Sequence, residues 1–359
     1  MMDVMKRNDQ TRELLLTHFY KYPDLQIRDI FKFLYQSIYG CEHMISSCDN
    51  AVKGIEEEYS FSRKNCKFSE VEKLDGKYIR VPLSYIDNGL SAETFGKLFY
   101  LSAKKDNGTS GLLLEKLDVV RNMISEEVLP FSENEFDCEF HSWKEKGFSA
   151  LHHSDVFREK YKPSYRVISE EFLPFLPLFA ELDKLLKSGC VKIAIEGGSA
   201  SGKTTLSRIL ENIYDCTVFH MDDFFLRPEQ RSSERYAQTG GNVDKERFLQ
   251  EVLVPLSKGE IINYRRFDCS EMKLTEPVCV CPGKLTVIEG AYSMHPELRE
   301  FYDFSVFLDI SPELQRERIE KRNTPQQSEQ FFQKWIPFEN RYFSEMHIKE
   351  KCDINIIIK

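Results

Sequence analysis

The chain has 359 residues, of which 30% are charged and 41% strongly apolar, and this composition favours a globular protein of two domains over a disordered chain. Its formal net charge of -9 disfavours a protein that binds nucleic acid regardless of sequence, because such a protein needs a basic face. No run of about 18 apolar residues occurs and no apolar stretch follows the first residues, so neither a membrane span nor a signal peptide is expected.

The ten cysteines do not have the spacing of a disulfide framework or of a zinc site. No two of them are separated by two residues, and the closest pair, Cys279 and Cys281, lies in a segment with strand character. We therefore interpret all ten as reduced thiols and expect a cytoplasmic protein.

Residues 1–165 are predicted to form a mainly helical domain. Apolar residues recur at helical spacing from Ile27 to Ile38, and Gly40 is placed to end that helix. A second helical pattern occupies 113–124, a short strand is expected at 78–81, and Ser91 is a candidate N-cap. The role of this domain is not apparent from its residues.

Residues 166–189 contain Pro174, Pro177 and a helical stretch ending at Gly189, and we interpret them as the join to a second domain at 190–359. Short β-branched runs then alternate with helical segments, which is typical of an α/β fold with a parallel sheet flanked by helices. The strands are expected at Val191–Ile195, Thr217–Met221, Leu285–Ile288, Phe304–Leu308 and Ile354–Ile358.

The first of these strands leads into a phosphate-binding loop (P-loop). The residues after it match G-x-x-x-x-G-K-[ST] in full, and a helical segment follows, as that motif requires. Glycines let backbone N–H groups turn inward around an anion, Lys203 supplies a point charge, and the Thr204 hydroxyl can ligate Mg²⁺. The predicted nucleotide-binding residues are Gly197, Gly198, Ser199, Ala200, Ser201, Gly202, Lys203, Thr204 and Thr205.

Four segments in order, GGSASGKTT, HMDDFF, RRFDC and VIEG, resemble the uridine kinase and phosphoribulokinase group of P-loop kinases. The resemblance extends over roughly residues 190–359, about half of the chain. It implies a phosphotransferase that uses ATP and Mg²⁺ to phosphorylate a hydroxyl group of a small molecule such as uridine or cytidine.

Two acids follow the strand expected at 217–221, at the sheet edge where ligands bind in such folds. The resemblance implies that Asp222 is the base that accepts the proton of the attacking hydroxyl. Asp223 is assigned either to Mg²⁺ or to a structural turn. The alternative for both is that they only cap a turn.

Glu289 ends the strand expected at 285–288, where a carboxylate can hold a metal-bound water. An ordinary acid at a strand end is the alternative. The expected metal site therefore comprises Thr204, Glu289 and Asp223.

The family holds its acceptor in the region that contains 236–248, and it closes a basic lid over the phosphates. The acceptor candidates are Phe225, Asn242, Asp244, Tyr264 and Phe267. Arg318 and Arg322 share one helix face and are assigned to the lid, with solvated surface charges as the alternative. The segment 323–327 has no further basic residue, unlike the lid of classical uridine kinases, and this leaves the acceptor open.

The first domain contains two polar clusters, one at Glu42 and His43 and one at His152, His153 and Ser154 followed by Tyr161, Tyr165 and Arg166. No metal-binding spacing supports a second site there, and a domain for regulation or assembly is preferred.

The sequence thus predicts a small-molecule kinase whose partner is a nucleoside-like acceptor, with no nucleic acid and no membrane, and it leaves a homo-oligomer open. One alternative is a kinase acting on a sugar phosphate or another small alcohol. A second is a regulatory ATPase that switches with its nucleotide, although no N-K-x-D motif for guanine occurs.

Overall fold

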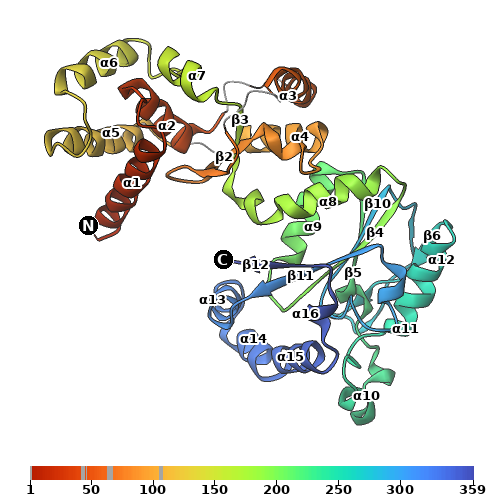
Figure 1. Cartoon of the computed structure of the whole chain (residues 1–359). Helices are drawn as coiled ribbons and strands as arrows, with labels where there is room; N and C mark the ends of the chain where they lie inside the picture. Colours follow the sequence, from red (N-terminus) through yellow and green to blue (C-terminus); the bar gives the residue numbers. More distant parts are fainter. Residues whose placement is uncertain (1, 42–44, 46, 63–67, 105–107) are drawn as a thin grey trace. The chain divides into compact units, whose positions relative to one another are not determined.

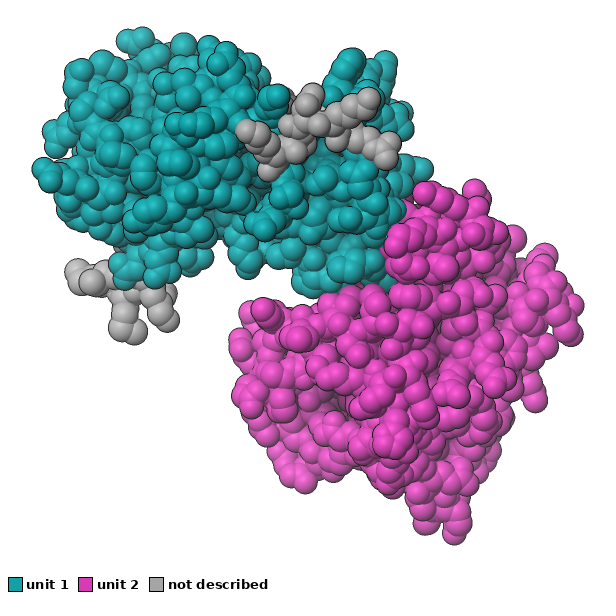
Figure 2. Space-filling model, viewed as in Figure 1, with its two compact units in different colours: residues 1–180 teal, residues 181–359 magenta. Residues whose placement is uncertain are grey.

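The computed structural model describes every residue except 1, 42–44, 46, 63–67 and 105–107. The chain divides into two compact units, Met1–Ala180 and Glu181–Lys359 (Figure 2). In the described parts, no helix is long and apolar enough to cross a membrane. The nine cysteines within them are free thiols, and Cys66 lies outside the described residues.

Unit 1 is mainly helical and contains a small antiparallel sheet in the order β1-β2-β3 (Figure 1). Its helices are α1 (Met2–Lys21), α2 (Ile27–Tyr39), α3 (Cys48–Ser62), α4 (Ala92–Ala103), α5 (Ser110–Ser125), α6 (Glu133–Glu145) and α7 (Asp155–Tyr161). Its strands are β1 (Glu72–Lys73), β2 (Tyr78–Pro82) and β3 (Tyr165–Ser169). The helix α8 (Leu176–Leu186) spans the boundary between the units.

The predicted start and stop signals of unit 1 act as expected. Ser91 caps α4 by accepting a hydrogen bond from the Thr94 N–H. Gly40 follows α2 with φ at +58°, and a Cβ there would lie 2.7 Å from the Tyr78 ring. Both the backbone conformation and the close ring therefore require glycine at that helix end.

A buried polar network lies inside unit 1. Arg80 on β2 is completely buried; its Nη1 donates to Glu72 Oε2 at 2.8 Å, and its Nε and Nη2 donate to Gln36 Oε1 at 2.9 and 2.7 Å. The other Glu72 oxygen accepts from His18 Nδ1 at 2.8 Å. Burial alone would raise the pKa of Glu72, but the charge of Arg80 and the hydrogen bonds from Arg80 and His18 lower it to about 2.

The network contains a second histidine. His153 Nδ1 donates to Asp29 Oδ1 at 2.8 Å, and its Nε2 accepts from the Tyr165 hydroxyl at 2.7 Å. Burial lowers the pKa of His153 to about 3 and also lowers the pKa of His18. Both imidazoles are therefore neutral in the folded chain at neutral pH.

We expect unit 1 to lose stability as the pH falls from 6.5, the ordinary histidine pKa, towards about 3. Above this window the imidazoles are neutral in both folded and unfolded chains. Within it the unfolded chain binds protons that the buried histidines do not, so the free energy of unfolding falls by up to about 1.4 kcal/mol per pH unit and proton.

Denaturant titrations of the Trp335→Phe variant test this, because Trp143 in unit 1 is then the only tryptophan of the chain. His153→Asn should reduce the slope with pH. An unfolding midpoint of the Trp143 signal that does not change with pH would contradict the neutral buried histidines.

Unit 2 is built on a five-stranded parallel sheet in the order β12-β11-β4-β10-β5, flanked by helices. The strands are β4 (Val191–Gly197), β5 (Cys216–His220), β10 (Leu285–Glu289), β11 (Phe304–Ile310) and β12 (Ile354–Ile358). All five predicted strands are present, and the predicted fold class is confirmed.

The helices of unit 2 are α9 (Lys203–Ile213), α10 (Ser233–Ala237), α11 (Lys245–Phe248), α12 (Val254–Ser257), α13 (Pro312–Arg322), α14 (Pro325–Gln330), α15 (Ile336–Glu345) and α16 (Ile348–Lys351). Two small ribbons pair β6 (Ile262–Tyr264) with β9 (Val278–Val280), and β7 (Phe267–Asp268) with β8 (Lys273–Leu274).

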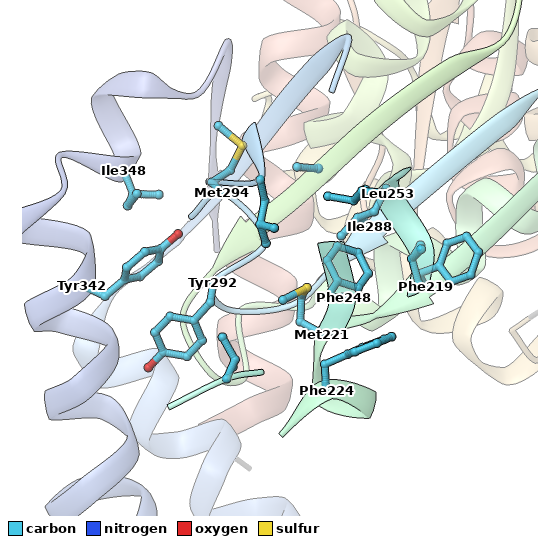
Figure 3. Packing of buried hydrophobic residues seen from close by; sticks show 14 of the residues in the cluster. Phe219, Met221, Phe224, Phe248, Leu253, Ile288, Tyr292, Met294, Tyr342 and Ile348 are labelled. Atoms are coloured by element: carbon cyan, nitrogen blue, oxygen red, sulfur yellow. The ribbon is translucent and has the colours of Figure 1, made fainter. Parts of the chain in front are cut away.

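The hydrophobic core of unit 2 packs the sheet against the segments that follow β5 and β10 (Figure 3). Phe224, just after β5, lies edge-on to Phe248 at 4.8 Å and stacked with Tyr264 at 5.8 Å between ring centroids. Tyr342 of α15 packs against Tyr292 at 4.7 Å. This packing fixes the ends of β5 and β10, where the candidate site lies.

Candidate active site

The P-loop lies between β4 and α9, as the motif predicted. Its backbone takes positive φ at Gly197 (+149°), Ala200 (+61°) and Gly202 (+99°). Lys203 Nζ donates to the carbonyl oxygens of Gly197 and Gly198, both at 2.9 Å. The Thr204 side of the loop is open to solvent at the start of α9. Such a loop with a lysine at a helix N-terminus fits a polyphosphate anion.

Gly197→Ala is expected to disrupt this loop. The residue has φ at +149°, and an added Cβ would lie 2.7 Å from the Leu308 carbonyl oxygen on β11. Because that neighbour is backbone, the loop must shift, and we expect nucleotide affinity to fall by more than about tenfold. Titration with a fluorescent ATP analogue measures the change, with Gly259→Ala, where a Cβ meets nothing, as the control for a positive φ alone. Equal affinities for the two variants would contradict it.

Glu289 joins the P-loop to the end of β5. Its Oε1 accepts from Thr204 Oγ1 at 3.0 Å and pairs with His220 Nδ1 at 2.6 Å. The parallel register places His220 directly opposite Glu289. Burial alone would raise the pKa of Glu289, but the His220 hydrogen bond and the Lys203 charge lower it, so it is ionised. A hydroxyl and a carboxylate side by side suit a hard cation such as Mg²⁺.

Asp222 lies just after β5 with its side chain exposed to solvent. The surrounding protein still strips part of its hydration and raises its pKa, and the negative charge of Glu289 adds to this rise. The positive charges of Lys203, His220 and Arg322 act on it in the opposite direction. An accessible carboxylate among these charges is suited to accept a proton.

Asp223, the next residue, lies beside two arginines. Its Oδ2 lies 3.5 Å from Arg266 Nε, and its backbone carbonyl accepts from Arg247 Nη2 at 2.9 Å. In this arrangement its carboxylate faces Arg266 in the turn after β5, and its assignment to Mg²⁺ or to the turn stays a prediction.

The two predicted lid arginines lie on α13 in different surroundings. Arg318 Nη1 donates to the Ala200 carbonyl at 3.2 Å, so it holds the P-loop backbone. Arg322 is exposed; its guanidinium lies 5.4 Å from the centre of the Phe331 ring. Its positive charge acts to lower the pKa of Asp222.

The five predicted acceptor residues fall into two groups. Phe225 is half-buried, 6.2 Å from the Trp335 ring. The other four are buried: Asn242, Asp244, Tyr264 and Phe267.

Packing explains most of the buried group. Asp244 caps α11 and pairs with Arg247 at 3.3 Å, and Tyr264 stacks on Phe224 in the core. Phe267 lies under the guanidinium of Arg231 at 5.5 Å. In this structure Phe225 is therefore the predicted aromatic residue with an accessible face.

Sequence reasoning missed the buried acid Glu196, the last side chain before the P-loop. Its carboxylate accepts from the N–H groups of Gly197 at 2.9 Å and Met294 at 3.0 Å, and from the Tyr342 hydroxyl at 3.0 Å. Burial raises its pKa to about 7. Glu196 could have been found in the sequence, because it is an acid within an otherwise apolar strand.

His220, Gln315 and Glu339 were also missed. His220 could have been found from its position at the end of the strand next to Glu289. Gln315 and Glu339 contact the P-loop at Ser199 from helices more than a hundred residues further along the chain, and no local pattern marks them.

The structure describes only one of the two polar clusters noted in unit 1. Glu42 and His43 lie outside the described residues. His152 is exposed, whereas His153 and Ser154 both bond to the buried Asp29. Among the residues that the structure describes, no group of three or more His, Cys, Asp or Glu could hold a metal ion.

The comparisons with known proteins concern unit 2. Residues 192–327 match the model of the Phosphoribulokinase / Uridine kinase family. The chain is 30% identical over 145 residues to a phosphoribulokinase of Synechocystis sp., and 28% identical over 148 residues to a uridine kinase of Aliivibrio salmonicida. Each alignment covers 37% of this chain; it spans 44% of the phosphoribulokinase and 68% of the uridine kinase.

A solved structure titled as a possible uridine kinase from Bacillus stearothermophilus aligns with 50% of this chain and 98% of that chain. The sequence identity is 21% and the TM-score 0.38.

Proposed function

We propose that the chain transfers the γ-phosphoryl group of ATP to a hydroxyl group of a small molecule, because residues 192–327 match the model of the Phosphoribulokinase / Uridine kinase family. One observation carries the proposal: Glu289 at the end of β10 accepts a hydrogen bond from Thr204 of the P-loop at 3.0 Å, and the exposed carboxylate of Asp222 follows the neighbouring strand β5. A phosphate cradle, a metal-ligating pair and a base are the parts that phosphoryl transfer needs.

The P-loop holds the donor nucleotide. Its N–H groups and Lys203 would bind the β- and γ-phosphates, while Thr204 and Glu289 would hold Mg²⁺ directly or through water. When bound there, Mg²⁺ would offset the negative charge of the phosphates. His220 donates to Glu289 and keeps that carboxylate oriented toward Thr204.

Asp222 acts on the acceptor. Its carboxylate accepts a hydrogen bond from the attacking hydroxyl, orients it, and takes its proton as the new O–P bond forms. Arg322 offsets the negative charge that collects around Asp222. Protein around the carboxylate raises its affinity for a proton, which favours this role.

We propose a nucleoside such as uridine or cytidine as the acceptor. Phe225 lies three residues after Asp222, and its half-buried ring is 6.2 Å from that of Trp335. Two partly exposed aromatic rings this close together suit the planar face of a nucleobase. The similarity to a phosphoribulokinase keeps a sugar phosphate as the second candidate.

ADP release from Mg·ATP by the purified chain tests the proposal, with uridine, cytidine, purine nucleosides, ribulose 5-phosphate and no acceptor as parallel reactions. We expect strong stimulation by a pyrimidine nucleoside and none in Lys203→Ala. Stimulation by the sugar phosphate alone would mean that the acceptor is a sugar phosphate and not a nucleoside. Slow hydrolysis that no small molecule increases would favour the nucleotide-switched ATPase.

A further inference from the structure

Side chains from two helices hold the tip of the P-loop, at Ser199 and Ala200. Gln315 Nε2 on α13 donates to the Ser199 carbonyl at 2.8 Å, and Arg318 Nη1 donates to the Ala200 carbonyl at 3.2 Å. Glu339 on α15 makes two further bonds to Ser199. The loop tip is thus held through both its carbonyls and one of its N–H groups.

The Glu339 contact is bidentate and buried. Its Oε2 accepts from the Ser199 N–H at 2.8 Å, and its Oε1 accepts from the Ser199 hydroxyl at 2.6 Å. Only 6% of Glu339 is exposed. Burial raises its pKa, while the Lys203 charge and the two Ser199 bonds act in the opposite direction. Burying a carboxylate is unfavourable unless hydrogen bonds compensate for the lost water, and here both compensating bonds come from Ser199.

The loop tip needs such support. Ala200 has a Cβ yet takes φ at +61°, a conformation that costs about 1 kcal/mol and persists only where its surroundings impose it. A Cβ on Gly198 would lie 2.9 Å from Gln315 Nε2 and 3.6 Å from Glu339 Oε2. The glycine therefore allows both side chains to lie directly against the loop backbone.

We propose that Glu339 is a positioning residue that sets the geometry of the P-loop through Ser199. The inference rests on the proposed function, because it concerns the loop that would bind the nucleotide. Without the carboxylate, Ala200 can relax and the N–H groups no longer converge before the phosphates arrive. The nucleotide must then order the loop, and its affinity falls.

Equilibrium binding of Mg·ATP and of a fluorescent ATP analogue to the intact chain, without any acceptor, tests the inference. Glu339→Ala should weaken binding by about tenfold or more, because it removes both acceptors of Ser199. Glu339→Gln should retain affinity within about threefold, because the amide oxygen still accepts the Ser199 N–H.

Ser199→Ala provides a second arm, since it removes only the hydroxyl bond. The double variant with Glu339→Ala should bind no more weakly than Glu339→Ala alone, because both changes remove one interaction. Glu329→Gln is the control, because it changes an exposed acid on the neighbouring helix α14. It should bind as the unmodified chain does.

Three outcomes would overturn the inference. Tighter binding by Glu339→Ala would mean that the carboxylate competes with phosphate for the loop. Unchanged affinity in a less stable Glu339→Ala would mean that the contact only supports packing. Binding by Glu339→Gln as weak as that by Glu339→Ala would mean that the charge of Glu339, and not its hydrogen bond, determines the affinity.

These outcomes differ from a failure of the proposed function. An unmodified chain that does not bind ATP would remove the kinase proposal itself. If the chain binds ATP but phosphorylates no nucleoside, only the proposed acceptor is wrong. The comparison of the Glu339 variants then remains valid. Once an acceptor is identified, Glu339→Ala should raise the KM for ATP and leave the KM for the acceptor unchanged.

Discussion

Asp222→Asn is expected to abolish phosphoryl transfer while leaving ATP binding intact. The amide has nearly the same shape as the carboxylate but cannot accept the proton of the attacking hydroxyl, and we expect kcat to fall by about 10²- to 10⁴-fold. Asp222 is exposed and lies outside the P-loop, so its replacement should not disturb that loop. ADP release with the active acceptor, together with ATP binding measured separately, gives both quantities.

Asp223→Asn is the matched comparison. Its carboxylate lies 3.5 Å from Arg266 Nε, and the proposal assigns the base role to Asp222 alone, so we expect a much smaller loss of kcat. Full activity in Asp222→Asn, or a larger loss in Asp223→Asn, would reassign the base.

Arg80→Ala should destabilise unit 1 by about 3–5 kcal/mol, because it removes one partner of a buried ion pair. The Arg80 side chain is completely buried, and without it Glu72 loses its charged partner and Gln36 loses two hydrogen bonds. Hydrogen exchange of the intact chain should show lost protection in β2 and α2, where Arg80 and Gln36 lie. Nucleotide binding by unit 2 provides a simultaneous check that the rest of the chain is folded.

Arg121→Ala is the control for this change. Arg121 also donates to a carboxylate, Asp137 at 2.7 Å, but both side chains are 41% exposed. Water screens and replaces such a pair, so we expect an effect below about 1 kcal/mol. Equal effects of the two changes would show that the buried network contributes nothing particular to stability.

Much of the fold of unit 2 was predictable because its signals are local. The five strands are short apolar runs, and each was placed to within about two residues, the usual uncertainty of such boundaries. The P-loop was readable because its glycines and Lys203 act through the backbone conformation of one contiguous segment. The positions of Asp222 and Glu289 followed from the rule that side chains after parallel strands meet at one sheet edge.

The buried aromatic residues show where this reasoning stops. Tyr264 and Phe267 sit among charged neighbours in the sequence, which suggested an open stacking surface. The pairing of β6 with β9 and of β7 with β8 instead turns both rings into the interior. Which face of a short strand is buried depends on its partner strands, and the sequence does not name those partners.

The sequence by itself determined the parallel sheet, the phosphate loop and the acids at the strand ends, because each depends on neighbouring residues. Only the tertiary structure decided what surrounds them. Glu339 meets Ser199 across 140 residues of chain, and His153 meets Asp29 across 124. Such contacts arise from the packing of separate helices, and that packing depends on the shapes of all the faces that meet rather than on any local pattern.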